Sequence, residues 1–283
     1  MRRLLKHLKL FSFFLALTVF PFKAHADCRI EPQAMLALNF DGFLPTVTVR
    51  INGHKVIMGI DTGAQATILT PQAVRALHLP PAPALKHIKM VRVETFDFAG
   101  VRRENLSLPV VSIPVHRLPN RNIAGLIGAN LLAHYDIDYN PPLHRISLYE
   151  TGTCSTIRPP WRGHYTAIPA IITRSHRMAI HVRLNGHALT AIIDTGSSGL
   201  RLASSSLHRV GLTRKDLVHD TANRMHRFKR LQIGNELFGE PHVQILRMPA
   251  KEADMLLGAN YLHRRRLWLS YAAHVLFIQK GTH

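Results

Sequence analysis

The sequence predicts an all-β protein, mainly strands with a few short helices, built from two homologous lobes. Residues 49–63 read VRINGHKVIMGIDTG and residues 182–196 read VRLNGHALTAIIDTG, with nine of fifteen positions identical at a constant offset of 133. A second pair of blocks follows in the same order, LIGANLL at 126–132 and LLGANYL at 256–262. Each copy also places Asn-Gly between two apolar runs, a strong β-hairpin signal. Two matched blocks in one order indicate a duplicated lobe.

We place the two lobes at residues 27–150 and 163–283, with a linker over residues 151–162. The linker contains one glycine and two prolines, which interrupt regular structure. A chain of 283 residues suffices for one large or two small domains. Its 46% apolar and 19% charged residues provide a core and exclude wholesale disorder.

Turn signals and periodicity predict the elements inside each lobe. Strands over 46–51 and 55–58 flank the first Asn-Gly turn, and strands over 181–184 and 187–193 flank the second. By the same criteria we expect these further elements: short helices over 71–77 and 204–210, a hairpin within 92–113, and closing strands over 145–149 and 274–278.

Residues 1–26 have the features of a signal peptide. Four basic residues precede an apolar run over 10–22, and Ala-His-Ala at 24–26 is the small-x-small pattern after which signal peptidase cuts. The run is short for a bilayer span, so an uncleaved anchor is the less favoured alternative. Asp27 before Cys28 disfavours lipid attachment. We expect a secreted or periplasmic protein beginning at Asp27.

Cys28 and Cys154 are the two cysteines of the chain. This number excludes a disulfide-dense scaffold and a cysteine-rich zinc module. In an oxidising compartment one disulfide between them is the economical interpretation, and two buried free cysteines are the alternative.

The chain is strongly basic, with 36 Lys and Arg against 17 Asp and Glu and a formal charge of +19. No interleaving of aromatic and basic residues supports nucleic-acid binding, so we expect no nucleic-acid partner and favour an anionic envelope surface.

The 19 histidines form no H-E-x-x-H motif or close cluster, and no phosphate-binding or nucleophile-elbow motif occurs. We therefore expect no metal and no cofactor. Three consecutive arginines at 264–266 precede an apolar strand, and we interpret them as a solvated strand edge.

Two Asp-Thr-Gly sequences carry the candidate chemistry. A single Asp-Thr-Gly sequence would be explained by a simple turn after a strand, without any catalytic role. Here each follows an apolar strand end and is followed about 65 residues later by two apolar residues and a glycine. With DTGAQATIL at 61–69 and DTGSSGL at 194–200, the chain resembles the aspartic proteases, the first stretch the retroviral enzymes and the second pepsin.

The resemblance covers nearly all of the chain after residue 26. It implies one chain that acts as a fused dimer, needs no second copy, and is a monomer. Its two small retropepsin-like β-barrel lobes would be related by a pseudo-two-fold axis, with a peptide-binding cleft between them. Asp61 and Asp194 would be the catalytic pair.

Peptide hydrolysis needs a base that activates water and an acid that protonates the leaving nitrogen. Two carboxyl groups about 3 Å apart cannot both ionise, so they share a proton and serve as both; the aspartic-protease dyad is the standard example of this behaviour. The resemblance further assigns supporting roles. Thr62 and Thr195 would hydrogen-bond to the opposite loop, Gly63 and Gly196 would allow a tight turn that aims an N–H at a carboxylate, and Gly128 and Gly258 would pack behind the loops.

The residue after each Asp-Thr-Gly differs between the lobes, Ala64 in the first and Ser197 in the second. In the family a hydroxyl here can donate to the neighbouring carboxylate, and a donor favours the charged form. This predicts that Asp194 is the ionised member and Asp61 the protonated one.

The family resemblance also implies a flap hairpin in each lobe, corresponding to 82–98 and 213–233. The second segment carries six basic residues against two acidic ones. A solvated basic hairpin is one interpretation, and a preference for anionic substrates is the other.

These observations predict a secreted or periplasmic aspartic endopeptidase acting on peptide or protein substrates. Two non-enzymatic alternatives remain at this point. One is a catalytically silent two-lobed protein that binds peptides in the cleft, and the other is an envelope-associated protein that binds anionic polymers.

Overall fold

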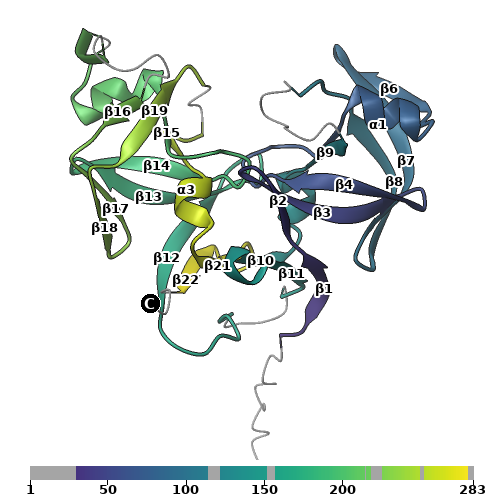
Figure 1. Ribbon diagram of the computed structural model, residues 1–283, viewed down its shortest axis with the longest axis horizontal. Helices are drawn as coiled ribbons and strands as arrows, with labels where there is room; N and C mark the ends of the chain where they lie inside the picture. Colours follow the sequence, from purple (N-terminus) through teal and green to yellow (C-terminus); the bar gives the residue numbers. More distant parts are fainter. Residues whose placement is uncertain are drawn as a thin grey trace, which may run out of the picture.

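The computed structural model describes residues 30–113, 122–151, 157–213, 215–217, 225–248 and 252–279. These residues are mainly strands with short helices, as predicted (Figure 1). The expected signal peptide at 1–26, Cys28 and Cys154 lie outside the described residues. In the described part of the chain, no helix is both long and apolar enough to cross a membrane.

The N-terminal lobe is one eight-stranded sheet with a short helix. Its strands and helix are β2 (Asn39–Asp41), β3 (Leu44–Ile51), β4 (His54–Ile60), β5 (Ile68–Leu69), α1 (Pro71–Ala76), β6 (Pro81–Leu85), β7 (Ile88–Phe98), β8 (Val101–Pro109) and β9 (Ile123–Ile127). The central order is β5-β9-β4-β3-β7-β6. The predicted Asn-Gly hairpin joins β3 to β4, and the predicted hairpin within 92–113 is β7–β8, whose first strand begins earlier, at Ile88.

The C-terminal lobe repeats this plan. Its elements are β13 (Met178–Leu184), β14 (His187–Ile193), β15 (Arg201–Ala203), the 3₁₀ helices η3 (Ser204–Val210) and η4 (Lys215–Leu217), β16 (Met225–Arg227), β17 (Arg230–Ile233), β18 (Glu236–Gly239), β19 (His242–Leu246) and β20 (Met255–Leu257). The second Asn-Gly hairpin joins β13 to β14. Both predicted short helices are present, α1 as an α-helix and η3 as a 3₁₀ helix.

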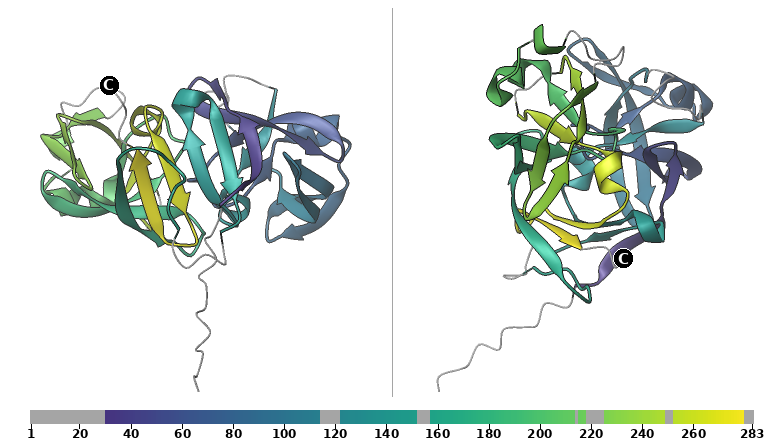
Figure 2. Two further views of the ribbon diagram at one scale, coloured as in Figure 1. Left: turned by 90° about the horizontal axis from the view of Figure 1, so that it is seen from below. Right: turned by 60° about the vertical axis from the view of Figure 1, so that its left-hand side comes forward.

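A six-stranded antiparallel layer joins the two lobes beneath them (Figure 2, left). Its order is β1-β11-β10-β21-β22-β12. Its strands, with the helices and 3₁₀ turn that adjoin them, are β1 (Pro32–Ala37), α2 (Ala129–Leu132), β10 (Asp136–Asn140), η2 (Pro141–Leu143), β11 (Arg145–Tyr149), β12 (Tyr165–Ile172), α3 (Ala259–Leu262), β21 (Arg266–Ser270) and β22 (Val275–Gln279). Both closing strands predicted from the sequence, β11 and β22, lie in this layer.

The central pair of this layer shows the pseudo-two-fold relation directly. In the β10–β21 ladder Asp138 pairs with Trp268, which is its sequence equivalent at an offset of 130. On either side of that pair, Ile137 pairs with Leu269 and Tyr139 pairs with Leu267. By the same offset Leu267 is the equivalent of Ile137 and Leu269 is the equivalent of Tyr139, so the two strands exchange equivalent positions about one point. Such self-complementary pairing is what a two-fold axis through the Asp138–Trp268 pair requires.

Neither sheet closes into a continuous barrel within the described residues, which modifies the expected β-barrel lobes. In the N-terminal lobe an isolated bridge between Leu69 and Val110 links the end of β5 to the residue after β8. Pro109 ends β8 and has no N–H to extend a ladder there. The lobe is therefore a curved open sheet whose edges approach at one bridge.

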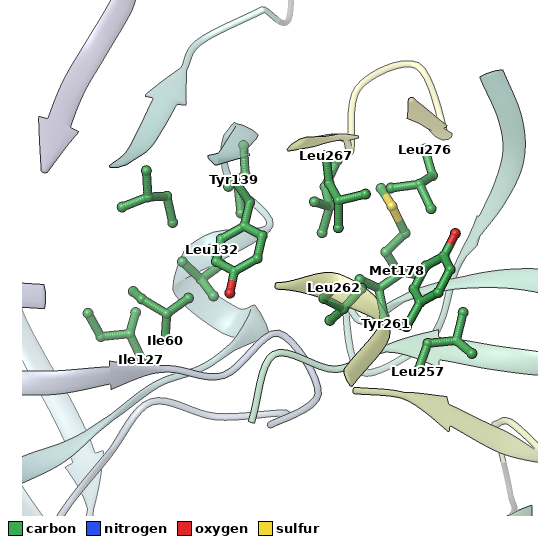
Figure 3. Close-up of a cluster of buried hydrophobic side chains, with 14 of the residues drawn as sticks. Ile60, Ile127, Leu132, Tyr139, Met178, Leu257, Tyr261, Leu262, Leu267 and Leu276 are labelled. Carbon is green, nitrogen blue, oxygen red and sulfur yellow. The ribbon is translucent and has the colours of Figure 1, made fainter. Parts of the chain in front are cut away.

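The core runs without a break from one lobe to the other. In Figure 3, Ile60, Ile127 and Leu132 lie on one side, and Leu257, Leu262 and Leu267 on the other. All six side chains are at most 1% exposed. Ile60 ends β4, and Leu257 ends β20, which pairs with β14. Because both residues belong to this core, the core anchors the loop that follows β4 and the segment that packs behind β14.

Asp138, at the centre of the joining layer, forms a buried ion pair with Arg266. Arg266 Nε donates to Asp138 Oδ1 at 2.9 Å and its Nη2 donates to Oδ2 at 2.5 Å. The guanidinium also lies over the Trp161 ring, 4.7 Å from its centroid. Arg265 pairs with Glu236 at 3.0 Å. The expectation of a solvated arginine edge at 264–266 is therefore wrong for two of its three residues.

Candidate active site

Asp61 and Asp194 come directly after β4 and β14, at the meeting point of the two lobes (Figure 1). Each strand pairs in parallel with the strand that carries the two apolar residues of the apolar-Gly motif and ends before its glycine, β4 with β9 and β14 with β20. The N–H of Asp61 donates to the Ile127 carbonyl, and that of Asp194 to the Leu257 carbonyl, both at 3.0 Å. This pairing explains why the two motifs occur together in each lobe.

Thr62 and Thr195 form a symmetric set of hydrogen bonds between the lobes. Thr62 Oγ1 donates to the Ile193 carbonyl at 2.6 Å, and Thr195 Oγ1 donates to the Ile60 carbonyl at 2.7 Å. Each hydroxyl also accepts the backbone N–H of the other threonine at 3.1 Å. Both residues are buried. The four bonds fix the spacing of the loops that carry the aspartates.

Gly63 and Gly196 each leave room for the aspartate carboxyl group of the opposite loop. A Cβ on Gly63 would lie 2.2 Å from Asp194 Cγ, and one on Gly196 would lie 2.3 Å from Asp61 Cγ. Neither glycine has the positive φ that a side chain would resist, so the expected need for a tight turn is not the reason for glycine. Each does direct its N–H to the aspartate of its own loop at 3.0 Å.

Gly128 and Gly258 lie behind the two loops. A Cβ on Gly128 would lie 2.5 Å from the backbone of Ala66, and one on Gly258 would lie 2.5 Å from the backbone carbonyl of Ser197. The N–H groups after these glycines also support the loops, since Ala129 donates to the Ala64 carbonyl at 2.8 Å. Backbone atoms cannot move aside, so a side chain at either glycine would displace an aspartate loop.

The two carboxyl groups are held unequally. Asp61 Oδ1 accepts two backbone N–H bonds, from Gly63 at 3.0 Å and Ala64 at 2.8 Å, whereas Asp194 Oδ1 accepts that of Gly196. Asp194 is 8% exposed. Burial, followed by the adjacent Asp61 charge, raises the pKa of Asp194 well above its usual value.

The sequence predicts that the Ser197 hydroxyl donates to the neighbouring aspartate, and the structure shows a different acceptor. Its Oγ donates to the Gly199 carbonyl at 3.0 Å, away from the Asp194 carboxyl group. Since N–H donors favour the charged form, these contacts favour a negative charge on Asp61 and a proton on Asp194. This is the reverse of the assignment expected from the Ala64/Ser197 difference.

The two predicted flap segments differ in structure. Residues 82–98 fall in the β6–β7 hairpin, which exposes the apolar Leu85 and Ile88 beside its turn. Residues 213–233 are described only in part, and there β16 pairs with β19 while β17 pairs with β13 and β18. The strands β16 and β17 of the second segment are thus built into the sheet, whereas residues 215–217 form η4. Its described basic side chains are exposed, namely Lys215, Arg227, Lys229 and Arg230.

Sequence reasoning missed Arg177 and Asn130. Arg177 donates to the Gly63 carbonyl across the lobe boundary at 3.3 Å. Asn130 Oδ1 accepts from the backbone N–H of Thr67 at 2.6 Å, tying the first aspartate loop to α2. Asn130 lies in the repeated G-A-N block, so the repeat was a usable signal for it, whereas Arg177 has no repeat and no motif. In the described part of the chain, no three His, Cys, Asp or Glu side chains are grouped to hold a metal.

Replacing Thr195 by valine is expected to lower the free energy of unfolding by about 1–3 kcal/mol for each buried group left unpaired. The change keeps the side-chain volume but removes the partner of the Ile60 carbonyl and of the Thr62 N–H. Urea denaturation of the variant beside wild type measures it. Thr166→Val, on β12 and partly exposed, is the control, and equal stability of Thr195→Val and wild type would contradict the prediction.

A family model described as gag-polyprotein putative aspartyl protease matches the chain twice, over residues 47–134 and 180–264. Each match contains one Asp-Thr-Gly sequence and one apolar-Gly motif. Among solved structures, basic 7S globulin from soybean aligns with a TM-score of 0.51 and 13% identity, over 88% of this chain and 95% of that one. This likeness shows a common fold. No curated protein matches the chain.

The two matched regions contain both aspartate loops, both inter-lobe threonines and both glycines that pack behind the loops. They are related to one another by the internal repeat, so one family unit occurs twice in a single polypeptide. Together they span more than half of the sequence, and the chain belongs to the gag-polyprotein putative aspartyl protease family.

Proposed function

We propose that the protein is an aspartic endopeptidase that hydrolyses peptide bonds through Asp61 and Asp194. Membership of the family and the fold support a protease-type function. The observation that carries the finer proposal is the contact between the two aspartate loops. Each carboxyl group lies against the glycine of the opposite loop, and the paired threonines hold that arrangement from both sides.

The unequal surroundings of the two acids assign their roles. Ionised Asp61 accepts a proton from a water molecule, whose oxygen attacks the peptide carbonyl carbon, while Asp194 donates its proton to the carbonyl oxygen. In the second step the C–N bond breaks, the leaving nitrogen takes the proton from Asp61, and the hydroxyl proton returns to Asp194. The cycle ends with both carboxyl groups in their starting states and needs no covalent intermediate.

We further propose that the protein is exported and cleaves peptides or proteins outside the cytoplasm. The basic and apolar pattern of residues 1–26 supports export. Residues 1–26 hold five Lys and Arg and no Asp or Glu, so the exported chain keeps a formal charge of +14. This charge supports an encounter with anionic surfaces or substrates, since a net positive field concentrates them.

The test is cleavage of a diverse peptide mixture by the protein beginning at Asp27, from about pH 3 to about pH 8, with and without pepstatin. Products are identified by mass spectrometry. We expect acid-favoured, pepstatin-sensitive internal cleavage. Folded protein that cleaves nothing at any of these pH values would contradict the proposal.

A further inference from the structure

Arg177 belongs to the C-terminal lobe but contacts the first aspartate loop. It lies directly before β13, and its side chain is 14% exposed. Its Nη1 donates to the carbonyl oxygen of Gly63 at 3.3 Å. Gly63 is the residue whose Cα packs against the Asp194 carboxyl group and whose N–H bonds to Asp61. One guanidinium therefore holds the residue that touches both acids.

The Arg177 guanidinium is itself held in place by two side chains. Its Nε donates to Ser175 Oγ at 2.8 Å and its Nη2 donates to Glu252 Oε2 at 2.5 Å. Ser175 Oγ also donates to Glu252. The bonds from Ser175 and Arg177 lower the pKa of Glu252 to about 2. The Glu252 carboxylate therefore stays charged, and Arg177 stays anchored, throughout the acid range in which such a dyad works.

The contact reaches Asp61 through a single peptide group. The carbonyl of Gly63 and the N–H of Ala64 belong to one peptide unit. The carbonyl accepts from Arg177, and the N–H donates to Asp61 Oδ1 at 2.8 Å. A positive charge on the carbonyl side polarises the unit and strengthens its N–H as a donor. A stronger donor stabilises the ionised carboxylate.

The N-terminal lobe has no arginine at the position equivalent to Arg177. The position equivalent to Arg177, 133 residues earlier, is Leu44, which is 2% exposed and part of an apolar cluster. Ala64 and its equivalent Ser197 each donate their N–H to the main-chain carbonyl of the aspartate in their own loop at 3.2 Å, and the Ala64 N–H also donates to Asp61 Oδ1. On β15, Arg201 lowers the pKa of Asp194 through its charge, against the larger effect of burial.

We propose that Arg177 is a positioning residue which, through the Gly63–Ala64 peptide, places the negative charge of the pair on Asp61 and so sets the direction of proton transfer. The inference rests on the proposed function. It identifies a further charged side chain that the reaction depends on, acting through the Gly63–Ala64 peptide.

The test is Arg177→Gln, compared with wild type in the pH profile of kcat/KM. Loss of the charge is expected to move the acid limb upward by about 0.5–1 pH unit, a three- to tenfold loss of activity on the acid side and little change near the optimum. Arg177→Lys keeps a charge and should restore part of the shift. Arg183→Gln is the matched control, since Arg183 lies exposed on β13, the strand that follows Arg177, and its side chain donates to the nearby Gly186 carbonyl.

A second measurement separates this inference from the proposed function. Carboxyl carbons of ¹³C-labelled aspartate are titrated by NMR in wild type and Arg177→Gln, which requires no activity. Inactive wild type with a raised Asp61 titration in the variant would refute the proposed function and leave the positioning role standing. Active wild type, with a folded variant whose acid limb and Asp61 titration are unchanged, would overturn the positioning role alone. A uniform loss of kcat at every pH, without a shift, would also overturn it.

Discussion

Replacing either Asp61 or Asp194 by asparagine is expected to reduce peptide cleavage by about 10⁴-fold, with little loss of stability. Asparagine keeps the size of the side chain and can still accept the backbone N–H bonds of Gly63 or Gly196. It cannot accept or release a proton, and each carboxyl group does both once in every cycle. Initial rates on one peptide identified from the mixture measure the loss.

The control for this pair is Asp97→Asn, the same chemical change at a turn in β7–β8, where Asp97 accepts the N–H of Gly100 at 2.9 Å. That variant should retain wild-type rates. Equal loss in both active-site variants indicates a shared pair. Cleavage that survives either substitution would show that the activity belongs to a contaminant or uses other residues.

The same pair predicts a pH dependence of stability with a definite sign. The pKa of Asp194 is raised in the folded protein, so the folded state holds this proton more tightly than the unfolded state. The free energy of unfolding therefore falls as the pH rises from the ordinary aspartate range through the raised pKa. Asp194→Asn should remove this slope, as measured by urea denaturation at several pH values, and a slope that persists would point to other groups.

Replacing Asp138 by alanine is expected to lower the free energy of unfolding by about 3–5 kcal/mol, the usual cost of leaving one member of a buried ion pair unpaired. Asp138 is 1% exposed and receives two bonds from Arg266 and one from the Trp161 Nε1 at 3.4 Å. The pair lies at the pseudo-two-fold axis, so its loss acts on the strands that join the lobes. Urea denaturation followed by tryptophan fluorescence measures it.

A double variant distinguishes the unpaired charge from lost packing. Asp138→Leu combined with Arg266→Met removes both charges and should recover much of the stability lost in the single variant. Glu104→Ala is the control, because its ion pair with Arg102 is exposed and should contribute about 1 kcal/mol at most. If Asp138→Ala costs no more than Glu104→Ala, the buried pair does not stabilise the joining layer.

The sequence by itself determined the local structure and the location of the chemistry. Asn-Gly turns between apolar runs determine the β3–β4 and β13–β14 hairpins, because few dipeptides accept the required backbone angles. The internal repeat shows that there are two lobes, and the doubled Asp-Thr-Gly marks Asp61 and Asp194. These features depend on neighbours within a few residues of one another, or on the recurrence of a pattern along the chain.

Only the tertiary structure decided which groups meet across the lobes. Gly63 is required by the Asp194 carboxyl group from the other lobe, and Asp138 pairs with Arg266, 128 residues away. The donor directions favour the opposite proton assignment to the one expected from the sequence: Ser197 turns to Gly199, and Ala64 offers Asp61 a second N–H. Hydrogen bonds and desolvation act over a few ångströms between residues far apart in sequence, and the order of residues along the chain does not specify those distances.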